Sequence, residues 1–308
     1  MSQVKWTAEG VAVLRAATRL DDGPVTHGDT FAYSFIRPRY RATILVPWMR
    51  RLARWKLERT IPGICNMHLA RTRFFDDELT AGLARGVRNV VILGAGLDSR
   101  AYRLVPGDGS VRVWEVDLPA NSAEKQRRVR QILGELPAFV TYVGADLSTA
   151  PLSETLAAAG LASDAPCIVL FEGVSMYLEV AAVAAVLDWV AQRPGSVLLM
   201  DFFVQDVFDY PDRYHGARSH FRYIIAKGEP YRLGFIPTAL PGFASEHGLR
   251  VTRLLPPDAV DTTYLRSHDG AWQGRGLGYL GLCRFETPNN DARQGRPADV
   301  SAEGANGD

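Results

Sequence analysis

The fold of this chain is constrained most by a glycine-rich turn that joins two apolar runs. The run at 90–93, VVIL, predicts a buried parallel strand, and Gly94 and Gly96 then allow the backbone to turn sharply beneath a ligand. A second strand is predicted over 111–116 and is followed by Asp117. This acid lies about twenty residues beyond the glycines, where nucleotide-binding βαβ units place the carboxylate that accepts hydrogen bonds from ribose hydroxyls. The segment therefore predicts a nucleoside pocket.

The third position of the glycine motif narrows the choice of ligand. Dinucleotide-binding turns of the form GxGxxG or GxGxxA keep that position small for helix packing, while the pyrophosphate lies at the helix N-terminus. This sequence has Ser99 there, which favours S-adenosylmethionine, a nucleoside cofactor without phosphate, over NAD or FAD. A nicotinamide oxidoreductase stays an alternative, as does a glycine turn that serves packing alone.

Strands and helices are predicted to alternate after the glycine turn. This alternation predicts an α/β fold with a doubly wound, parallel sheet, which binds ligands at the carboxyl ends of its strands. The predicted strands cover 90–93, 111–116, 139–143, 167–171 and 197–201, with a last strand at 281–285, and the predicted helices cover 122–133, 152–159, 180–191 and 242–247.

Five motifs, in this order, resemble those of the leucine carboxyl methyltransferase family, and more narrowly its bacterial, actinomycete-rich branch. They are RTRFFDDEL from Arg71, VVILGAGLDSRAYRL from Val90, WEVDLP from Trp114, ADLS from Ala145 and FEGVSMYLE from Phe171. The resemblance covers residues 71–190 and continues weakly to residue 285. It implies a Rossmann-like class I methyltransferase with a seven-stranded, mostly parallel sheet and S-adenosylmethionine as cofactor.

The resemblance also implies which residues contact the cofactor. Arg71 matches an arginine that grips the carboxylate of the methionine part, a task that suits a planar and always charged guanidinium, and Arg73 is the other candidate. Glu172 matches a glutamate near the methionine ammonium, with helix capping as its alternative role. The other implied residues are Gly94, Ala95 and Gly96 in the loop, Asp117 at the ribose, and Asp146 and Leu147 near the adenine.

The methyl acceptor is less constrained than the cofactor. Family members with peptide-carboxylate substrates carry a cofactor-contacting lysine that has no match before Arg71 here, so the substrate is not inherited. A carboxylate, with a pKa of about 4, is already anionic and needs only alignment and an orienting cation, whereas a phenol or alcohol needs a base. We expect a carboxyl O-methyltransferase acting on a small organic acid, a natural-product intermediate or a peptide. Hydroxyl O-methylation in secondary metabolism and an inactive S-adenosylmethionine-binding partner protein are the alternatives.

The chain is expected to have three parts. Residues 1–80 predict a helical lid, residues 81–286 a methyltransferase core, and residues 287–308, which are polar and lack periodicity, a disordered tail. The segment 202–240 is too long for a plain connection and predicts part of the substrate pocket, with a solvent-facing insertion as the alternative. No catalytic residue is assigned, and no histidine spacing predicts a metal. The candidate substrate residues are Tyr177, His215, His220, Arg222 and Tyr223, of which Tyr177, His215 and His220 are base candidates for a hydroxyl acceptor.

Composition argues against several other classes of protein. The 308 residues, 47% hydrophobic, suffice for a large core, and a net charge of +1 gives no basic field for nucleic acid. Three widely spaced cysteines and the lack of a signal segment predict a cytoplasmic protein with reduced thiols. No apolar run approaches the ~18 residues of a spanning helix, so no membrane partner is expected, and the oligomeric state stays open. The basic clusters at 37–41, 50–59 and 126–128 are interpreted mostly as solvated helix faces, with an entrance for an acidic substrate as the alternative for the first two.

Overall fold

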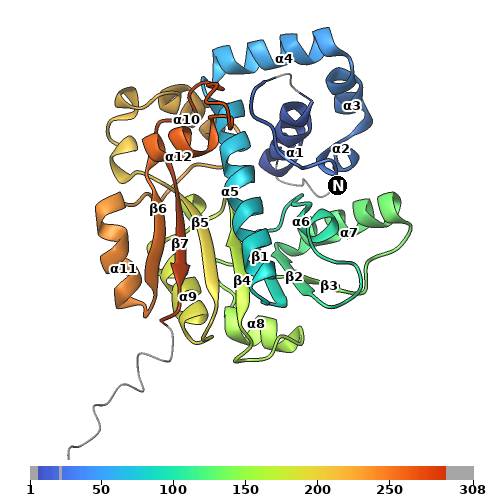
Figure 1. Cartoon of the computed structure of the whole chain (residues 1–308), viewed down its shortest axis with the longest axis vertical. Coiled ribbons are helices and arrows are strands. Elements are labelled where there is room, and N and C mark those ends of the chain that lie inside the picture. Colours follow the sequence, from blue (N-terminus) through green and yellow to red (C-terminus); the bar gives the residue numbers. More distant parts are fainter. Residues whose placement is uncertain (1–5, 21–22, 289–308) are drawn as a thin grey trace, which may run out of the picture.

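A seven-stranded sheet forms the centre of the protein, in the strand order β3-β2-β1-β4-β5-β7-β6 (Figure 1). The computed structural model describes residues 6–20 and 23–288 of the chain. Strand β7 is antiparallel to both of its neighbours, whereas the pairs formed among β1 to β5 are parallel. The expected doubly wound, mostly parallel sheet is therefore confirmed. The strands are β1 (Asn89–Leu93), β2 (Arg112–Asp117), β3 (Val140–Gly144), β4 (Cys167–Phe171), β5 (Val197–Phe203), β6 (Arg250–Leu255) and β7 (Leu280–Glu286).

The central strands are apolar along their whole length because both faces of the sheet are covered. Val90 and Ile92 of β1 belong to a buried cluster that also contains Phe74. Val91 and Leu93, which point to the opposite face, belong to a second cluster on the other side of the sheet. The sheet thus packs against a hydrophobic core on each face. The carboxyl ends of its strands lie outside these two cores, where a ligand can bind.

Helices cover both faces, and several of them begin at proline, whose fixed φ suits the first helical turn. Prolines occupy the first position of α3, α4, α7 and α12. The α-helices after the first strand are α6 (Arg100–Arg103), α7 (Pro119–Leu133), α8 (Leu152–Ala158), α9 (Val180–Ala191), α10 (Ala217–Ala226), α11 (Leu240–Glu246) and α12 (Pro257–Tyr264). Short 3₁₀ helices are η1 (Ser175–Tyr177), η2 (Gln205–Val207), η3 (Pro211–Arg213) and η4 (Pro237–Ala239).

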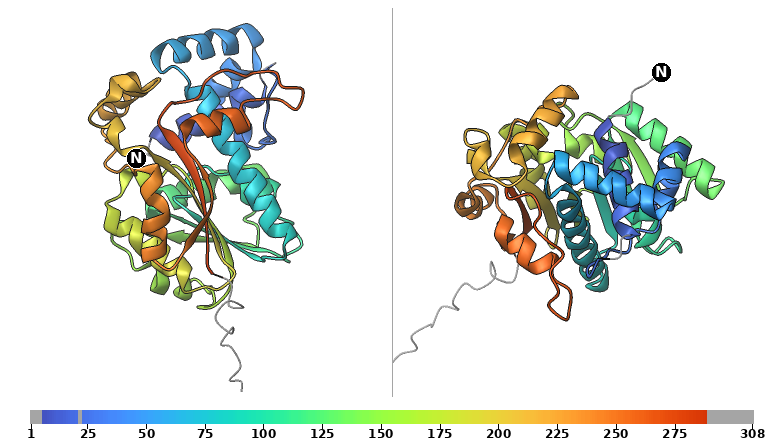
Figure 2. Two further views of the ribbon diagram at one scale, coloured as in Figure 1. Left: turned by 60° about the vertical axis from the view of Figure 1, so that its left-hand side comes forward. Right: turned by 90° about the horizontal axis from the view of Figure 1, so that it is seen from above.

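Five helices precede the first strand within the described residues, and four of them, α1 to α4, lie at the top of the molecule in Figure 1 and in the left view of Figure 2. The five helices are α1 (Trp6–Arg19), α2 (Ala32–Phe35), α3 (Pro38–Leu45), α4 (Pro47–Thr60) and α5 (Ile64–Ala84). Helix α5 differs from the other four because it continues past residue 80 and packs on β4, β5 and β7. The division into a lid of residues 1–80 and a core of residues 81–286 stays a prediction.

The predicted elements agree closely with the structure where local pattern decides them. The strand at 167–171 and the helix at 180–191 have the predicted bounds, and β1, β2 and β3 differ by one residue at one or both ends. Strand β5 runs to Phe203, two residues into the segment interpreted as an insertion. Strand β6 and helix α12 had no predicted bounds.

Thr287 is the first residue of the expected tail. Thr287 is buried, and its hydroxyl oxygen accepts a hydrogen bond from the Gly195 N–H at 2.8 Å, so it belongs to the folded part of the chain. Pro288 is exposed, and residues 289–308 lie outside the described residues, so the tail stays a prediction.

Candidate functional site

A cavity of about 860 Å³ lies at the carboxyl ends of β1 to β4, where the sequence predicts the ligand. This volume is within the range of about 300–1,000 Å³ that is typical of small-molecule sites. One part of its wall comes from the loops that follow the strands, and another, more apolar part comes from α1, α4, α5 and α10. The first part includes Gly94, Ala95, Gly96, Asp117, Asp146, Leu147 and Glu172, and the second includes Leu14, Leu57, Ile61, Met67 and Ile224.

The glycine turn after β1 has the left-handed backbone that its residue type permits. Gly94 has a φ of 67° and Gly96 a φ of 42°. A Cβ on Gly94 would lie 2.2 Å from the Cγ2 atom of Val174, so no side chain fits there. The Gly96 N–H donates to Asp117 Oδ2 at 2.5 Å, and the Leu118 N–H donates to Asp117 Oδ1 at 2.7 Å. These bonds fix the predicted ribose acid beside the glycines.

The predicted adenine pair lies in the next loop along the sheet. Asp146 is exposed and lines the cavity, and its Oδ1 atom accepts a hydrogen bond from the Ser148 N–H at 2.9 Å. Leu147 lines the same wall. The Ala145 N–H donates to the Asp117 carbonyl at 2.8 Å, which ties this loop to the end of β2.

The two candidate arginines of α5 have different surroundings. Arg71 is buried and lines the cavity; its Nε lies 2.9 Å from Glu172 Oε1, and its Nη1 lies 2.9 Å from Asp201 Oδ2. Burial alone lowers the pKa of the Arg71 guanidinium, but Glu172 and Asp201 outweigh burial and raise the pKa above its ordinary value. Arg73 instead donates to the Tyr264 carbonyl at 2.6 Å and is not part of the cavity wall. The surroundings favour Arg71 as the residue that faces a ligand.

A second buried arginine, which the sequence analysis did not single out, joins this network. Arg100 Nη1 lies 2.6 Å from Glu172 Oε2 and 2.5 Å from Asp98 Oδ2, and its Nε lies 2.7 Å from Asp76 Oδ1. Burial raises the pKa of the Asp201 carboxyl, against the opposing effect of Arg71. Glu172 therefore bridges two guanidinium groups at the wall of the cavity.

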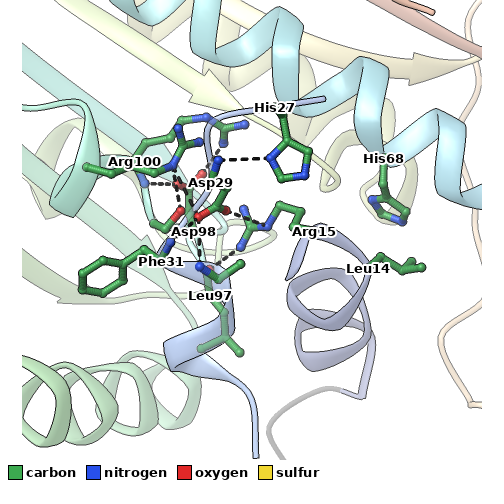
Figure 3. Close-up of polar contacts among 12 residues, drawn as sticks. Leu14, Arg15, His27, Asp29, Phe31, His68, Leu97, Asp98 and Arg100 are labelled. Carbon is green, nitrogen blue, oxygen red and sulfur yellow. Dashed lines mark hydrogen bonds and ion pairs between the residues drawn. The ribbon is translucent and has the colours of Figure 1, made fainter. Parts of the chain in front are cut away.

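The first helix is anchored to the loop that follows β1. Arg15 of α1 donates to the Leu97 carbonyl at 2.5 Å, and its Nε lies 3.4 Å from Asp29 Oδ2 (Figure 3). His27 is held nearby, because its Nδ1 accepts from the Asp29 N–H at 3.1 Å. This cluster joins the N-terminal helices to the glycine turn, and it could not be recognised from any motif.

His68 is a cavity residue that the sequence analysis missed. It projects from α5 on the side of α1 that carries Leu14 (Figure 3), and it is 5% exposed. Its Nδ1 lies 3.2 Å from Arg71 Nη2. Because a guanidinium nitrogen can only donate, Nδ1 is the acceptor, and the neutral ring carries its proton on Nε2. No partner of Nε2 is found among the residues that the structure describes. Burial, followed by Arg71 and His220, holds the pKa of His68 well below its ordinary value.

Three of the five predicted substrate residues line the cavity: Tyr177, His220 and Tyr223. Both ring nitrogens of His220 are engaged, Nδ1 with the Tyr279 hydroxyl and Nε2 with the Tyr231 hydroxyl at 3.1 Å. Burial, followed by Arg71, lowers the pKa of His220 to about 3. Burial also raises the pKa of Tyr177 to about 12. These side chains are neutral over the ordinary pH range.

The other two predicted substrate residues lie outside the cavity wall. His215 contacts the loop before β7, where its carbonyl accepts a hydrogen bond from the Gly278 N–H at 3.2 Å. Arg222 is exposed on α10. The helical period of α10 explains the difference, because His220, Tyr223 and Ile224 share a face toward the cavity that Arg222 does not share.

No group of three metal-ligating side chains is found within residues 6–20 and 23–288. In the same part of the chain, no helix has the length and apolarity that crossing a bilayer requires. The three cysteines, Cys65, Cys167 and Cys283, are buried and form no disulfide.

A doubly wound sheet with a glycine turn, an acid after β2 and a cavity across the strand ends defines a nucleoside-dependent α/β enzyme. Sequence comparison then identifies the family: residues 8–191 match the model of the leucine carboxyl methyltransferase family. A relative from Mycolicibacterium gilvum is 31% identical over 314 residues, covering 98% of this chain and 90% of the relative. Another, from Mycobacterium tuberculosis, is 33% identical over 224 residues, covering 70% of each chain. Both relatives are named as S-adenosyl-L-methionine-dependent methyltransferases.

Solved structures agree with the fold. A duf574 family protein from Streptomyces avermitilis has a TM-score of 0.55 at 19% identity, covering 91% of this chain and 97% of its own. A structure from Thermobifida fusca has a TM-score of 0.55 at 16% identity, covering 78% and 88%. The chain belongs to the leucine carboxyl methyltransferase family and is an S-adenosylmethionine-dependent methyltransferase. The expected family, fold class and cofactor are thereby confirmed.

Proposed function

We propose that this protein transfers the methyl group of S-adenosylmethionine to a carboxylate oxygen of a small organic acid, a natural-product intermediate or a peptide, forming a methyl ester. The observation that carries the proposal is that none of the base candidates for a hydroxyl acceptor is placed to act as one. His220 has both nitrogens engaged, burial raises the pKa of Tyr177 to about 12, and His215 lies outside the cavity wall. A carboxylate acceptor needs no base.

The cofactor is proposed to lie along the wall formed by the strand-end loops. Asp117 accepts from the ribose hydroxyls and Asp146 from the adenine amine, while Leu147 packs on the ring and the turn of Gly94, Ala95 and Gly96 passes beneath. Arg71 binds the methionine carboxylate, and Glu172 faces the ammonium. The fit is supported by Arg71 Nε, which is buried and makes no hydrogen bond of good geometry within the described chain, although it lies close to Glu172.

The acceptor is proposed to occupy the apolar part of the cavity. Leu57 and Ile61 provide apolar surface there, and the His68 Nε2–H and the Tyr177 hydroxyl are neutral donors for the acceptor carboxylate. When bound, S-adenosylmethionine supplies an electrophilic methyl group, which the carboxylate oxygen attacks in line; the sulfonium leaves as the thioether of S-adenosylhomocysteine. The chain contributes alignment and exclusion of water. A cytoplasmic location and a role in secondary metabolism belong to the same proposal.

The test is an acceptor screen with the purified protein, S-adenosylmethionine and matched sets of carboxylic acids and phenols, with products identified by mass spectrometry. Ester formation is expected with an apolar acid, at a rate that is flat above about pH 6, because a carboxylate with a pKa of about 4 is already ionised. Methylation of phenols alone, at a rate that rises with pH, would replace the proposal with hydroxyl methylation. Cofactor binding without any transfer would favour the inactive partner protein.

The role of His68 has its own test. In His68→Asn the amide keeps an acceptor near Arg71 but loses the donor at Nε2, whereas in His68→Gln the amide reaches the Nε2 position. For the acid found in the screen, His68→Asn is expected to raise KM about tenfold, the equivalent of ~1.4 kcal/mol, and His68→Gln is expected to restore much of the loss. Cofactor affinity, measured by calorimetry, should stay unchanged in His68→Asn, because its amide still accepts from Arg71. A loss of cofactor affinity in His68→Gln, together with an unchanged KM in His68→Asn, would show that His68 acts only by supporting Arg71.

A further inference from the structure

Helix α4 turns an apolar stripe away from the rest of the protein. Trp48, Leu52 and Trp55 are 66%, 52% and 55% exposed. Their spacing of four and three residues places them on one side of the helix. In Figure 1 the helix forms the upper edge of the molecule, and in the view from above in Figure 2 it lies in front. The stripe is therefore an outward face and no part of the core.

The opposite side of α4 supplies the packing that holds the helix in place. Arg50 is buried and donates to the Ile44 carbonyl at 2.8 Å, and Leu57 lines the cavity. The carboxylate of Glu58 accepts from the Gly63 N–H at 2.7 Å and from the Cys65 N–H at 3.0 Å, so it serves the N-terminus of α5. The inner side of α4 thus packs against the rest of the chain, whereas Trp48 and Trp55 on the outer side are more than half exposed.

The outer side of α4 is also basic. Within Pro47–Thr60 the sequence PWMRRLARWKLERT has five Lys or Arg residues and one acid, which is the inward Glu58. Arg51, Lys56 and Arg59 are exposed. The guanidinium of Arg59 lies 5.0 Å from the ring centroid of Trp55, so positive charge accompanies the apolar stripe.

We propose that this face of α4, defined by Trp48, Leu52 and Trp55, docks on the surface of an anionic phospholipid bilayer. Helices that lie in the bilayer interface typically carry tryptophan and leucine on one side, with Lys and Arg beside them. A symmetric contact with a second copy would bring the same basic face against itself, so like charges oppose that occupant. Peripheral contact of this kind needs no spanning helix, and the proposal departs from the sequence expectation that the protein has no membrane partner.

Co-sedimentation of the full chain with vesicles tests the proposal. Binding is expected to vesicles of phosphatidylglycerol mixed with phosphatidylcholine, to be weak with phosphatidylcholine alone, and to fall as salt screens the headgroup charge. In Trp48→Ser/Trp55→Ser the partition coefficient is expected to fall by at least about tenfold. Trp272→Ser is the matched control, because Trp272 is 42% exposed elsewhere and its loss should leave binding unchanged.

Both variants alter exposed positions, so unchanged circular dichroism and melting temperature are expected to show that they fold. The proposal is overturned if the protein ignores anionic vesicles or if the double variant binds them as well as the parent does. Light scattering gives a further outcome: a dimer that the double variant converts to a monomer would assign the face to a second copy. A monomer that binds no vesicles but binds a purified acidic protein through α4 would assign it to that class of partner.

Discussion

At the residue scale, Arg71 is held by the groups that a bound cofactor is expected to rearrange. Its guanidinium lies between Glu172 and Asp201, and its third contact is with His68. A ligand carboxylate that reaches Arg71 therefore enters a network whose charges are already paired. The free-energy cost of rearranging that network is offset only if the ligand brings its own ammonium to Glu172. The network should therefore select ligands that carry both a carboxylate and an ammonium, as amino acids do.

Replacing Arg71 is expected to weaken S-adenosylmethionine binding. Arg71→Ala should raise Kd at least about 30-fold, the equivalent of ~2 kcal/mol for a lost hydrogen bond to a charged group. Arg71→Lys keeps the charge and loses the planar fork, so its Kd should lie between those of the parent protein and Arg71→Ala. Because this variant leaves no buried acid without a cation, it is the control for loss of folding. Calorimetry measures both variants, with NADH as the ligand that should not bind.

Arg73→Ala is the control for this prediction, because Arg73 is on the same helix but contacts the Tyr264 carbonyl. Its Kd should equal that of the parent protein. Unchanged affinity in Arg71→Ala would remove Arg71 from the site, and a loss in Arg73→Ala alone would exchange the two roles.

Alanine substitutions at Gly94 and Gly86 distinguish the cost of backbone strain from the cost of a steric clash. Both have a positive φ, but a Cβ on Gly94 would meet Val174, whereas a Cβ on Gly86 has no atom within 4 Å. Gly86→Ala should lower the free energy of unfolding by about 1–2 kcal/mol. Gly94→Ala should lower it by more and weaken cofactor binding. Urea unfolding measures both, and Gly94→Ala/Val174→Ala should recover the difference; equal losses in the two single variants would contradict the contact.

At the scale of elements, α1 is connected to the glycine turn by Arg15. The side chain is buried and donates to the Leu97 carbonyl while it pairs with Asp29. Val11 and Leu14 of the same helix line the cavity. A disturbance of α1 is therefore expected to reach the cofactor loop.

Arg15→Ala is expected to loosen α1 and the loop after β1 together. Amide hydrogen exchange in α1 should become at least about tenfold faster, since the local opening free energy falls when a buried pair is broken. The control is Arg39→Ala, because Arg39 makes an exposed contact with the Tyr40 hydroxyl. If exchange became faster in α1 alone and stayed unchanged in the loop after β1, Arg15 would not couple the stability of the helix to that of the loop.

The elements themselves were predictable to different degrees. Strands β1 and β4 are continuous apolar runs, which local sequence identifies. Strand β6, RVTRLL, was not delimited because it lies at the edge of the sheet, where its residues are only half-buried and its apolar pattern is weak. The length of β5 was underestimated because its last two residues, Phe202 and Phe203, pair with β7 some eighty residues further along the chain.

At the scale of the whole molecule, buried neutral histidines link stability to pH. Burial lowers the pKa of His27 to about 4 and that of His220 to about 3, from an ordinary value of 6.5. Because the unfolded chain binds these protons at higher pH, the stabilisation is full above pH 6.5 and is lost as pH falls from 6.5 toward 4. Glu115 and Asp261 oppose this trend, since burial raises their pKa values to about 7 and about 6.

A comparison of variants isolates the contribution of His27. His27→Asn keeps an acceptor for the Asp29 N–H but does not titrate. The free energy of unfolding of the parent protein relative to this variant should fall by up to about 3 kcal/mol between pH 7 and pH 4. Urea unfolding at a series of pH values measures the difference. Parallel pH profiles for the two proteins would show that His27 keeps its ordinary pKa.

The sequence by itself determined the sheet and the strand-end loops that line the cavity. Apolar runs, glycines and acids at strand ends are local features, and the topology of a doubly wound sheet brings Gly94, Asp117, Asp146 and Glu172 to one edge without further information. Only the tertiary structure decided the partners of the buried charges. Arg71 and Asp201 are 130 residues apart in sequence, and no local pattern encodes which acid an arginine meets. The same reason explains why His68 and Arg100 were missed and why His215 and Arg222 lie outside the cavity wall. It also explains why an outer face of α4 is exposed, because burial and pairing depend on what the rest of the chain places opposite each side chain.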